Sequence, residues 1–396
     1  MSTQTLGRLE PRSLLEAAAQ MREAAVTRSR LVFTGGGTHR APDLAAVDAI
    51  LSTRALRRVV EYAPEDQTVT VEAGLTLDAL AQELAAHGQR LVVEVAEPER
   101  ATIGGAILMN AFGARRMCYG SIKDLILGVT LVRADGVPVR AGGKVVKNVA
   151  GFDLSKLIVG SYGTLALLTS ATLRVHPLPE ATRALRAAGM AAADVWALVL
   201  AIRARQIEPG GILALRNGEG DPYEVHVLIE GFRAGVDAKV DALRTLIAEH
   251  PWQLDEISPD TVRDADAAIR RSGALRARCT TLPADFALTD EAVISPLLGT
   301  LAGSAAVAYP ALGVAFIAGT PNDATSAQAA LAASRREAER RSGSLVVEAM
   351  PSDAGGLPLR FDWWGTPPPS FSLMAALKAR FDPHGRLSPG TFVGGM

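Results

Sequence analysis

The sequence of 396 residues has little cysteine, few aromatic residues and no excess of charge of either sign. Its two cysteines, Cys118 and Cys279, lie far apart, so they form no C-x-x-C pair and cannot by themselves hold a zinc ion or an iron–sulfur cluster. Two isolated cysteines are typical of small buried side chains in a reducing compartment. The net charge of −1 gives no basic surface for nucleic acid or for an anionic membrane.

Long apolar runs are missing as well. No window of about 18 residues is both apolar and free of charge, so we expect no transmembrane helix. The first residues, "MSTQTLGRLEPRSLLEAAAQ", lack the continuous apolar core of a signal peptide. With the low cysteine content, these absences predict a cytoplasmic protein. The length suggests two or three domains of roughly 150 residues each.

Common nucleotide, metal and hydrolase motifs are absent too. No G-x-G-x-x-G follows a strand, and "GGK" at 142–144 is not a Walker loop, because Pro138 stands where that motif requires glycine. Neither H-E-x-x-H nor G-x-S-x-G occurs. No two of the six histidines have the spacing of metal ligands, so we predict no metal site.

The N-terminal region contains several local patterns that predict secondary structure. Thr76 is placed to cap a helix, and Asp135-Gly136 has the composition of a tight hairpin turn. A Pro-containing stretch at 177–180 predicts the first domain boundary. The expected elements are helices at 13–27 and 77–88, a strand at 31–33 and a hairpin at 125–143.

The region after this boundary alternates single helices with pairs of strands. This rhythm predicts an α+β domain whose antiparallel sheet is covered by helices on one face. The expected helices are 193–205, 234–249, 291–302 and 324–341, and the expected strands are 212–215, 224–229, 281–287, 305–309, 313–317 and 344–348. A last helix, 372–381, leads into "DPHGRLSPG". We therefore expect three parts, 1–178, 179–350 and 351–396.

Three glycine-rich segments carry the chemistry: "FTGGGTHR" at 33–40, the segment 97–136 with "ATIGG", and 142–169 with "NVAGFD" and "GSYGT". A single glycine run could be only a turn. Consecutive glycines, however, let backbone N–H groups converge on an anion, because no Cβ blocks close approach or positive φ. Gly35, Gly36, Gly37 and Thr38 would cradle a phosphate in this way, with no lysine needed.

In this order and spacing, the three segments resemble the PCMH-type FAD-binding domain of the vanillyl-alcohol oxidase family, over about residues 10–178. The resemblance implies an α+β fold with a two-subdomain FAD-binding domain, a smaller α+β cap with an antiparallel sheet, and a tail that returns to the FAD domain. His39 lies after the glycine loop rather than inside it, so we expect non-covalent FAD. The residues that the resemblance assigns to FAD are Gly35, Gly36, Gly37, Thr38, Thr102, Gly104, Gly105, Asn110, Asn148, Gly151, Asp153, Gly160, Ser161, Gly163 and Thr164.

The sequences of 142–169 and of the tail are similar to those of the FAD-binding E-type subunits of bacterial glycolate oxidases. The tail reads "FDWWGTPPPSFSLMAALKARFDPHGRLSPGTFVGGM". Phe152, Ala166 and Ser388 are mild departures from that pattern. The resemblance implies a complex with a catalytic flavoprotein subunit and an iron–sulfur subunit. Such a complex oxidises glycolate, a small 2-hydroxyacid, to glyoxylate and passes electrons on. It could lie at the inner face of a membrane through its partners.

The catalytic residues stay unknown at this point. Full 2-hydroxyacid dehydrogenases carry an H-x-H-x-G-D-G-N metal motif that this chain lacks, and no set of a base and a carboxylate-binding group stands out. Two alternatives therefore remain: a stand-alone FAD-dependent 2-hydroxyacid dehydrogenase, and a non-catalytic scaffold subunit. Sugar-lactone oxidation fits the tail less well.

Several single residues allow two interpretations. Arg115 and Arg116 could be solvated or could meet an anion or a partner, and Arg386 could lie near the flavin phosphates or face solvent. Trp363 and Trp364 could form an interface or belong to a core. The remaining residues are interpreted as structural or surface residues: His226, Lys147 and Lys156.

Overall fold

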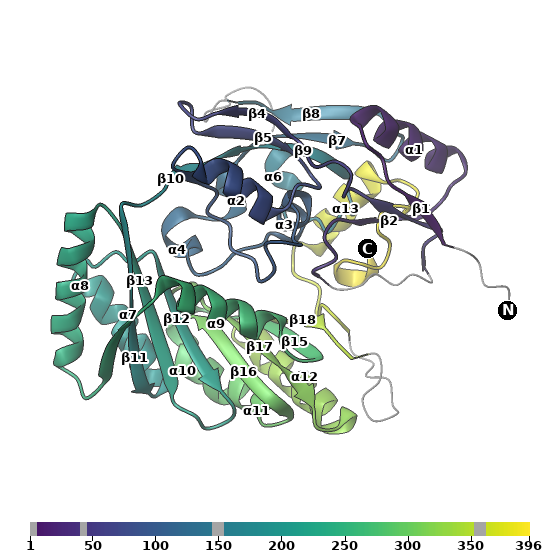
Figure 1. The fold of residues 1–396 in the computed structure, drawn as a ribbon. Helices are drawn as coiled ribbons and strands as arrows, with labels where there is room; N and C mark the ends of the chain where they lie inside the picture. Colours follow the sequence, from purple (N-terminus) through teal and green to yellow (C-terminus); the bar gives the residue numbers. More distant parts are fainter. Residues whose placement is uncertain (1–5, 40–45, 145–153, 352–361) are drawn as a thin grey trace. The chain divides into compact units, whose positions relative to one another are not determined.

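A computed structural model describes residues 6–39, 46–144, 154–351 and 362–396 of the chain (Figure 1). The chain divides into two compact units. The first unit consists of Met1–Phe112, Gly120–Leu178 and Pro367–Met396. The second consists of Gly113–Tyr119 and Pro179–Thr366. The last stretch of the sequence is therefore part of the first unit, and a short segment beginning at Gly113 is part of the second.

The first unit is built on two main sheets. In the three-stranded sheet, of order β1-β3-β2, both pairings are parallel. In the five-stranded sheet, of order β4-β5-β9-β7-β8, every pairing is antiparallel, and β10 pairs separately with β6. The strands are β1 Gly7–Leu9, β2 Leu31–Thr34, β3 Ala49–Ser52, β4 Val59–Ala63, β5 Thr68–Glu72, β6 Gln89–Arg90, β7 Ile126–Val132, β8 Pro138–Gly142, β9 Leu167–Arg174 and β10 His176–Pro177.

Capping side chains and a glycine mark the ends of helices in the first unit. Thr76 caps α2 by accepting a hydrogen bond from the Ala79 amide, as predicted. Ser13, which was expected inside the first helix, instead caps α1 by accepting one from the Glu16 amide. Gly88, after α2, has φ +65°. The helices are α1 Leu14–Val26, α2 Leu77–Ala85, α3 Ile103–Met109, α5 Ile122–Leu125, α6 Leu154–Leu157 and α13 Phe371–Phe381.

The predicted hairpin is also present. β7 pairs with β8 up to Val132 and Pro138, and Gly136 in the turn between them has φ +79°. A Cβ on Gly136 would lie 2.6 Å from the Arg22 nitrogen in α1. Glycine is therefore needed here both for the backbone conformation and for the close packing of α1.

The second unit is one antiparallel sheet of order β14-β11-β13-β12-β16-β17-β15-β18 (Figure 1). Its strands are β11 Ala181–Met190, β12 Gly211–Asn217, β13 Tyr223–Gly231, β14 Gln253–Ile257, β15 Leu275–Thr280, β16 Leu301–Tyr309, β17 Val314–Pro321 and β18 Ser344–Ala349. Its longer helices are α7 Ala192–Ala204, α8 Arg233–Ala248, α9 Pro259–Arg271 and α12 Ala324–Arg340. The short α4, Arg116–Tyr119, also belongs to this unit.

One face of this sheet carries the core of the second unit. Alternate residues such as Val225, Val227 and Ile229 of β13 pack there with apolar side chains of α7, α8 and α12. The opposite face is not bare, because α9 lies on it: the Tyr309 hydroxyl donates to Asp266 of α9 over 2.6 Å. The prediction of helices on one face only was therefore wrong. The sequence of α9 is mostly polar and buries only two apolar residues, Val262 and Ile269, so the helix has a weak apolar signal.

The strand predicted at 281–287 was wrong, whereas the helix predicted at 291–302 is present in part. The strand ends at Thr280, and a helical run follows, made of α10 Phe286–Thr289, a π-helical turn η3 Asp290–Ile294 and α11 Ser295–Leu298. Pro296 in this run has no N–H to donate, which disfavours regular α-helical hydrogen bonding there. The strands β11 and β14 were not predicted. Both carry charged residues, Arg183 and Arg186 in β11 and Asp255 and Glu256 in β14, that weaken their apolar signal.

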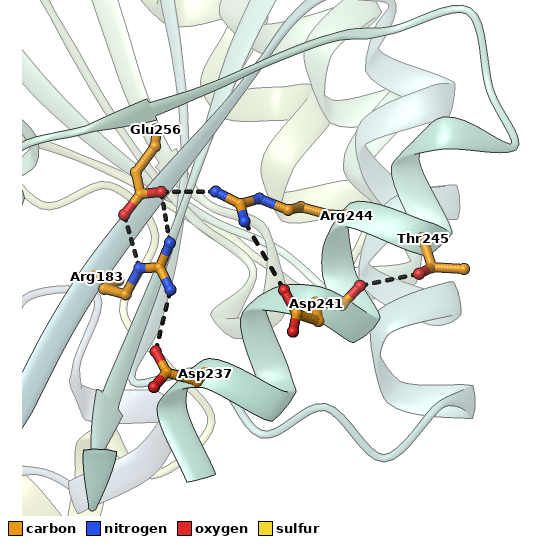
Figure 2. Close-up of polar contacts among 6 residues, drawn as sticks. All are labelled: Arg183, Asp237, Asp241, Arg244, Thr245 and Glu256. Carbon is orange, nitrogen blue, oxygen red and sulfur yellow. Dashed lines mark hydrogen bonds and ion pairs between the residues drawn. The ribbon is translucent and has the colours of Figure 1, made fainter. Parts of the chain in front are cut away.

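Strand β14 lies at one edge of the sheet, and ion pairs between side chains connect it to neighbouring elements (Figure 2). Glu256 accepts two hydrogen bonds of 2.6 Å from Arg183 of β11, and Arg244 of α8 donates to it over 2.7 Å. Arg183 also meets Asp237 of α8 at 3.1 Å. The hydrogen bond from Arg183 lowers the pKa of Glu256. Charges of this kind protect an edge strand against pairing with another chain.

Candidate cofactor site

The glycine loop follows directly from β2. Within the described part of the chain, the backbone amides of Gly35, Gly36, Gly37 and Thr38 donate to no acceptor of the protein. Buried or half-buried amides normally find a partner, and Gly36 is buried. A run of four consecutive free amides is an anion-binding arrangement, because their N–H dipoles can converge on one charged group.

The three glycines are required for two different reasons. A Cβ on Gly35 would overlap the Thr102 hydroxyl, and one on Gly36 would overlap the Arg100 carbonyl oxygen. These two glycines therefore let the loop pack against the segment 100–102. Gly37 has φ +68° and nothing within 4 Å of its would-be Cβ, so its requirement is the left-handed backbone itself. The loop is both a packed turn and a set of free donors.

The second glycine segment supports this loop and keeps its own amides engaged. Thr102 caps α3 by accepting the Gly105 N–H at 3.2 Å, and the Gly104 N–H donates to the Ala73 carbonyl over 2.7 Å. The Ile103 N–H donates to the Leu75 carbonyl over 2.8 Å. Of the two predicted loops, 35–38 is the one with amides left for a ligand. The segment 102–105 fixes its position.

The third group of predicted residues forms a turn on the end of α3. The Gly160 N–H donates to the Ile107 carbonyl over 3.1 Å, and a Cβ on Gly160 would lie 3.5 Å from the Asn110 Cβ. Asn110 ends the helix with φ +51°. The Asn110 Oδ1 and the Ser161 hydroxyl are buried without a hydrogen-bond partner. Buried polar atoms are normally paired, so these two atoms are available to a polar ligand.

Within the first unit, the structure thus joins the predicted residues through a chain of neighbouring contacts. The loop 35–38 packs on 100–102, Thr102 starts α3, and the end of α3 carries the turn 160–164. Four free amides fit a pyrophosphate, and the unpaired atoms of Asn110 and Ser161 fit further polar atoms of a dinucleotide. The remaining predicted residues, Asn148, Gly151 and Asp153, lie outside the described residues, as do Lys147 and Phe152.

Other single-residue interpretations can now be revisited. Arg386 is buried and donates to the carbonyls of Ala24 and Ala134 over 2.9 and 2.6 Å. The solvent-facing alternative is therefore wrong, and both terminal nitrogens of Arg386 bind carbonyls of the protein. Arg115 lies in the second unit, where its Nε donates over 3.2 Å to the Glu230 carboxylate, whose side chain is 1% exposed.

Lys156 lies on α6 in the first unit, and His39 is exposed; His226, Trp363 and Cys279 lie in the second unit. His226 is buried, and burial lowers its pKa because it disfavours the charged ring. This agrees with a structural role. Trp363 is half-buried against the core of that unit, and its carbonyl accepts from the Val347 amide over 2.8 Å. Burial raises the pKa of Cys279 to about 12, as expected for an inert core thiol.

Lys378 was missed in the sequence. It lies on α13 with a side chain that is 11% exposed, and its ammonium donates to the Thr164 carbonyl, in the turn 160–164, over 2.8 Å. Its spacing from Asp382, four residues on at the end of a helix, is the one signal that could have singled it out.

Among the described residues, no group of three or more His, Cys, Asp or Glu side chains is arranged to hold a metal ion. In the same residues, no helix has both the length and the apolar character to cross a membrane.

Comparison with known proteins indicates the cofactor. Residues 6–142 match the family described as FAD binding domain. The glycolate oxidase subunit GlcE of Escherichia coli (strain K12) is 36% identical over 168 residues, which are 42% of this chain and 48% of that protein. A D-2-hydroxyglutarate dehydrogenase of Xanthomonas citri pv. viticola is 27% identical over 417 residues, covering 96% of this chain and 87% of that protein. The matching part thus spans about half of the length of GlcE.

A solved structure shares the fold. The structure of p-cresol methylhydroxylase with substrate bound has a TM-score of 0.74 and 13% sequence identity, covering 96% of this chain and 87% of that one. This likeness confirms the expected PCMH-type α+β fold. The chain carries an FAD-binding domain of the kind found in flavin-dependent oxidoreductases, and FAD is its cofactor.

Proposed function

We propose that this chain is the FAD-binding, E-type subunit of a glycolate-oxidase-type complex, which oxidises a small 2-hydroxyacid and passes electrons to partner subunits. The observation that supports this most is the set of free amides at 35–38 inside a region that matches an FAD binding domain. The similarity to a protein named glycolate oxidase subunit GlcE supports the substrate class and the complex. The partners would be a catalytic flavoprotein subunit and an iron–sulfur subunit, in the cytoplasm.

In this proposal the residues of the first unit hold FAD. The amides of Gly35 to Thr38 bind its pyrophosphate, and Asn110 and Ser161 bind other polar atoms of it. FAD supplies a two-electron acceptor when bound. The hydroxyacid loses two electrons and two protons and becomes the 2-oxoacid. FAD is held without a covalent bond, since His39 is exposed beyond the loop.

The first test is the visible absorption spectrum of the purified chain, before and after acid precipitation. A flavin spectrum that moves to the supernatant is the expected result. A flavin that stays in the pellet would contradict the non-covalent site. A protein that stays colourless after incubation with FAD would favour a scaffold subunit instead.

The second test asks whether the chain turns over alone. Glycolate is added to the chain by itself and to the chain reconstituted with its partner subunits, and flavin bleaching is followed under anaerobic conditions. We expect bleaching with glycolate only in the complex, because the chain shows no evident base. Bleaching of the isolated chain by a hydroxyacid would contradict the subunit role.

One comparison favours a second candidate function. The D-2-hydroxyglutarate dehydrogenase of Xanthomonas citri pv. viticola aligns with 96% of this chain. An alignment over nearly the whole chain is what we expect if the chain is itself a stand-alone dehydrogenase. Steady-state reduction of an artificial electron acceptor by the isolated chain, with D-lactate, D-2-hydroxyglutarate and glycolate in parallel, separates the two candidates. Turnover with any of the three favours the dehydrogenase.

A further inference from the structure

The C-terminal segment runs beside β2, the strand that leads into the glycine loop (Figure 1). The Leu31 N–H donates to the Arg386 carbonyl over 2.8 Å, and the Ser388 N–H donates to the Leu31 carbonyl over 2.6 Å. Leu387 forms a parallel bridge with Leu31. The tail thus covers an edge of β2 and is fixed to the strand that carries Gly35 to Thr38.

Lys378 connects this tail to the other half of the cofactor site. Its ammonium donates to three oxygens: the Thr164 carbonyl over 2.8 Å, the Leu387 carbonyl over 2.9 Å and the Asp382 carboxylate over 2.7 Å. An ammonium has three donors, so each one is used. Asp382 has a fully buried side chain and also accepts the Leu387 N–H over 2.7 Å.

These contacts connect the glycine loop, α3, the turn 160–164 and the C-terminal tail in a closed series. The loop 35–38 packs on Thr102, α3 begins at Thr102, and the turn 160–164 sits on the end of α3. Lys378 then connects Thr164 to Leu387 through two hydrogen bonds. Leu387 pairs with Leu31 of β2, the strand that leads into the glycine loop 35–38. Gly163 also fits closely between Phe33 and Ser388, 3.1 and 3.2 Å from its would-be Cβ. The Lys378 side chain thus binds both the turn and the tail by hydrogen bonds.

The burial of this lysine has a cost that the contacts offset. Burial lowers the pKa of Lys378, while the hydrogen bond to Asp382 acts in the opposite direction. A lysine whose task was only to end the helix would remain in water, where Arg380 of the same helix lies exposed. A buried ammonium with three oxygen partners fixes the distance between those partners.

We propose that Lys378 is a positioning residue of the cofactor site, which holds the turn 160–164 at a fixed distance from the glycine loop so that both can bind one FAD molecule. This inference rests on FAD binding at the site described above. It extends that site to the C-terminal segment, which lies far from it in the sequence.

The test compares Lys378→Met with Arg380→Met, a matched exposed control on the same helix. FAD affinity is measured by flavin fluorescence titration of the apoprotein, and inorganic pyrophosphate affinity by competition. Lys378→Met should weaken FAD binding by at least about tenfold, because each removed bond involves a charged donor. Its pyrophosphate affinity should be unchanged, since pyrophosphate needs the glycine loop alone. Arg380→Met should match the wild type in both.

The outcomes separate positioning from general stability. Unchanged FAD affinity in Lys378→Met would overturn the proposal, as would an equal loss of FAD and pyrophosphate affinity with a lowered melting temperature of the apoprotein. If Lys378→Met gives no soluble protein, Lys378→Arg decides. Its planar group keeps the charge but not the three-way geometry, so we expect weaker FAD binding at an unchanged melting temperature. Wild-type affinity in a soluble Lys378→Arg would then overturn it.

Failure of the broader function looks different. If the wild-type chain itself binds no FAD, the cofactor proposal fails before any variant is compared. If the wild type binds FAD and Lys378→Met binds it equally well, only the positioning role fails.

Discussion

At the scale of single residues, the glycine loop shows that one motif can meet several demands. Gly35 and Gly36 are needed because the segment 100–102 leaves no room for a Cβ. Gly37 is needed because its φ is +68°, a conformation that costs other residues about 1–2 kcal/mol. A glycine loop that only turned the chain would have no reason to leave four amides without partners.

The first prediction concerns Gly37→Ala and its matched control Gly88→Ala. Both glycines have left-handed φ, +68° and +65°, and neither has an atom within 4 Å of its would-be Cβ. Both variants should therefore lose about 1–2 kcal/mol of folding free energy. Only Gly37→Ala places a methyl group beside the free amides, so it should also weaken FAD binding by about tenfold or more, which corresponds to about 1.4 kcal/mol.

Fluorescence titration with FAD and thermal melting of the apoprotein measure the two effects separately. Equal FAD affinity in the two variants would mean that the amides at 35–38 do not form the pyrophosphate site.

At the scale of secondary-structure elements, short-range contacts set where helices begin, whereas contacts with distant residues hold an edge strand in place. The caps at Ser13 and Thr76 act within one helical turn and fix where α1 and α2 begin. The edge strand β14 is instead held by charges from two other elements, β11 and α8 (Figure 2). Exposed ion pairs contribute little each, and a network in which one carboxylate meets two arginines contributes more.

A second prediction follows for Glu256→Gln in this network. We expect a loss of about 0.5–1 kcal/mol in folding free energy at low salt, measured by urea unfolding, and a smaller loss in 1 M NaCl, at which salt screens exposed charges within about 3 Å. Glu249→Gln, whose carboxylate meets the single Arg205, should lose less. Equal losses at both salt concentrations would contradict an electrostatic role.

The same network predicts a pH dependence. The hydrogen bond from Arg183 lowers the folded-state pKa of Glu256 below that of the unfolded chain. The stabilisation is therefore fully present above the ordinary glutamate pKa of about 4.3, and it is lost as the pH falls through the lowered value. The difference in stability between wild type and Glu256→Gln should shrink as the pH falls below about 4.

At the scale of the whole molecule, each unit has its own apolar core. The first unit packs around two clusters that include Leu80 and Met21, and the second around one cluster that includes Val225. The three described segments of the proposed FAD site all lie in the first unit. Cofactor binding should therefore stabilise that unit directly.

A further prediction is that calorimetry resolves two unfolding transitions and that FAD moves one of them. At an FAD concentration about 100 times the dissociation constant, linkage adds about 2.7 kcal/mol to the unit that binds it. For a unit of roughly 150–250 residues, this corresponds to about 5–10 °C in melting temperature. An equal shift of both transitions, or a single transition in all conditions, would contradict independent units.

The sequence by itself determined the features that depend on neighbouring residues. The Thr76 cap, the Asp135-Gly136 turn, the order of the glycine segments and hence the FAD-binding domain were all readable, because their physical causes act over a few positions. The same locality explains the errors. The sequence of α9 is mostly polar, so its apolar signal is weak, and the charged strands β11 and β14 show their pattern only beside the strands they pair with.

Only the tertiary structure decided what each glycine and each buried charge does. Gly104 and Gly37 look alike in the sequence, but the Gly104 amide meets the Ala73 carbonyl while the Gly37 amide has no protein acceptor among the described residues. Lys378 reaches Thr164 across 214 positions of sequence. Whether a donor is free or engaged depends on chain segments brought together by folding, and no local pattern carries that information.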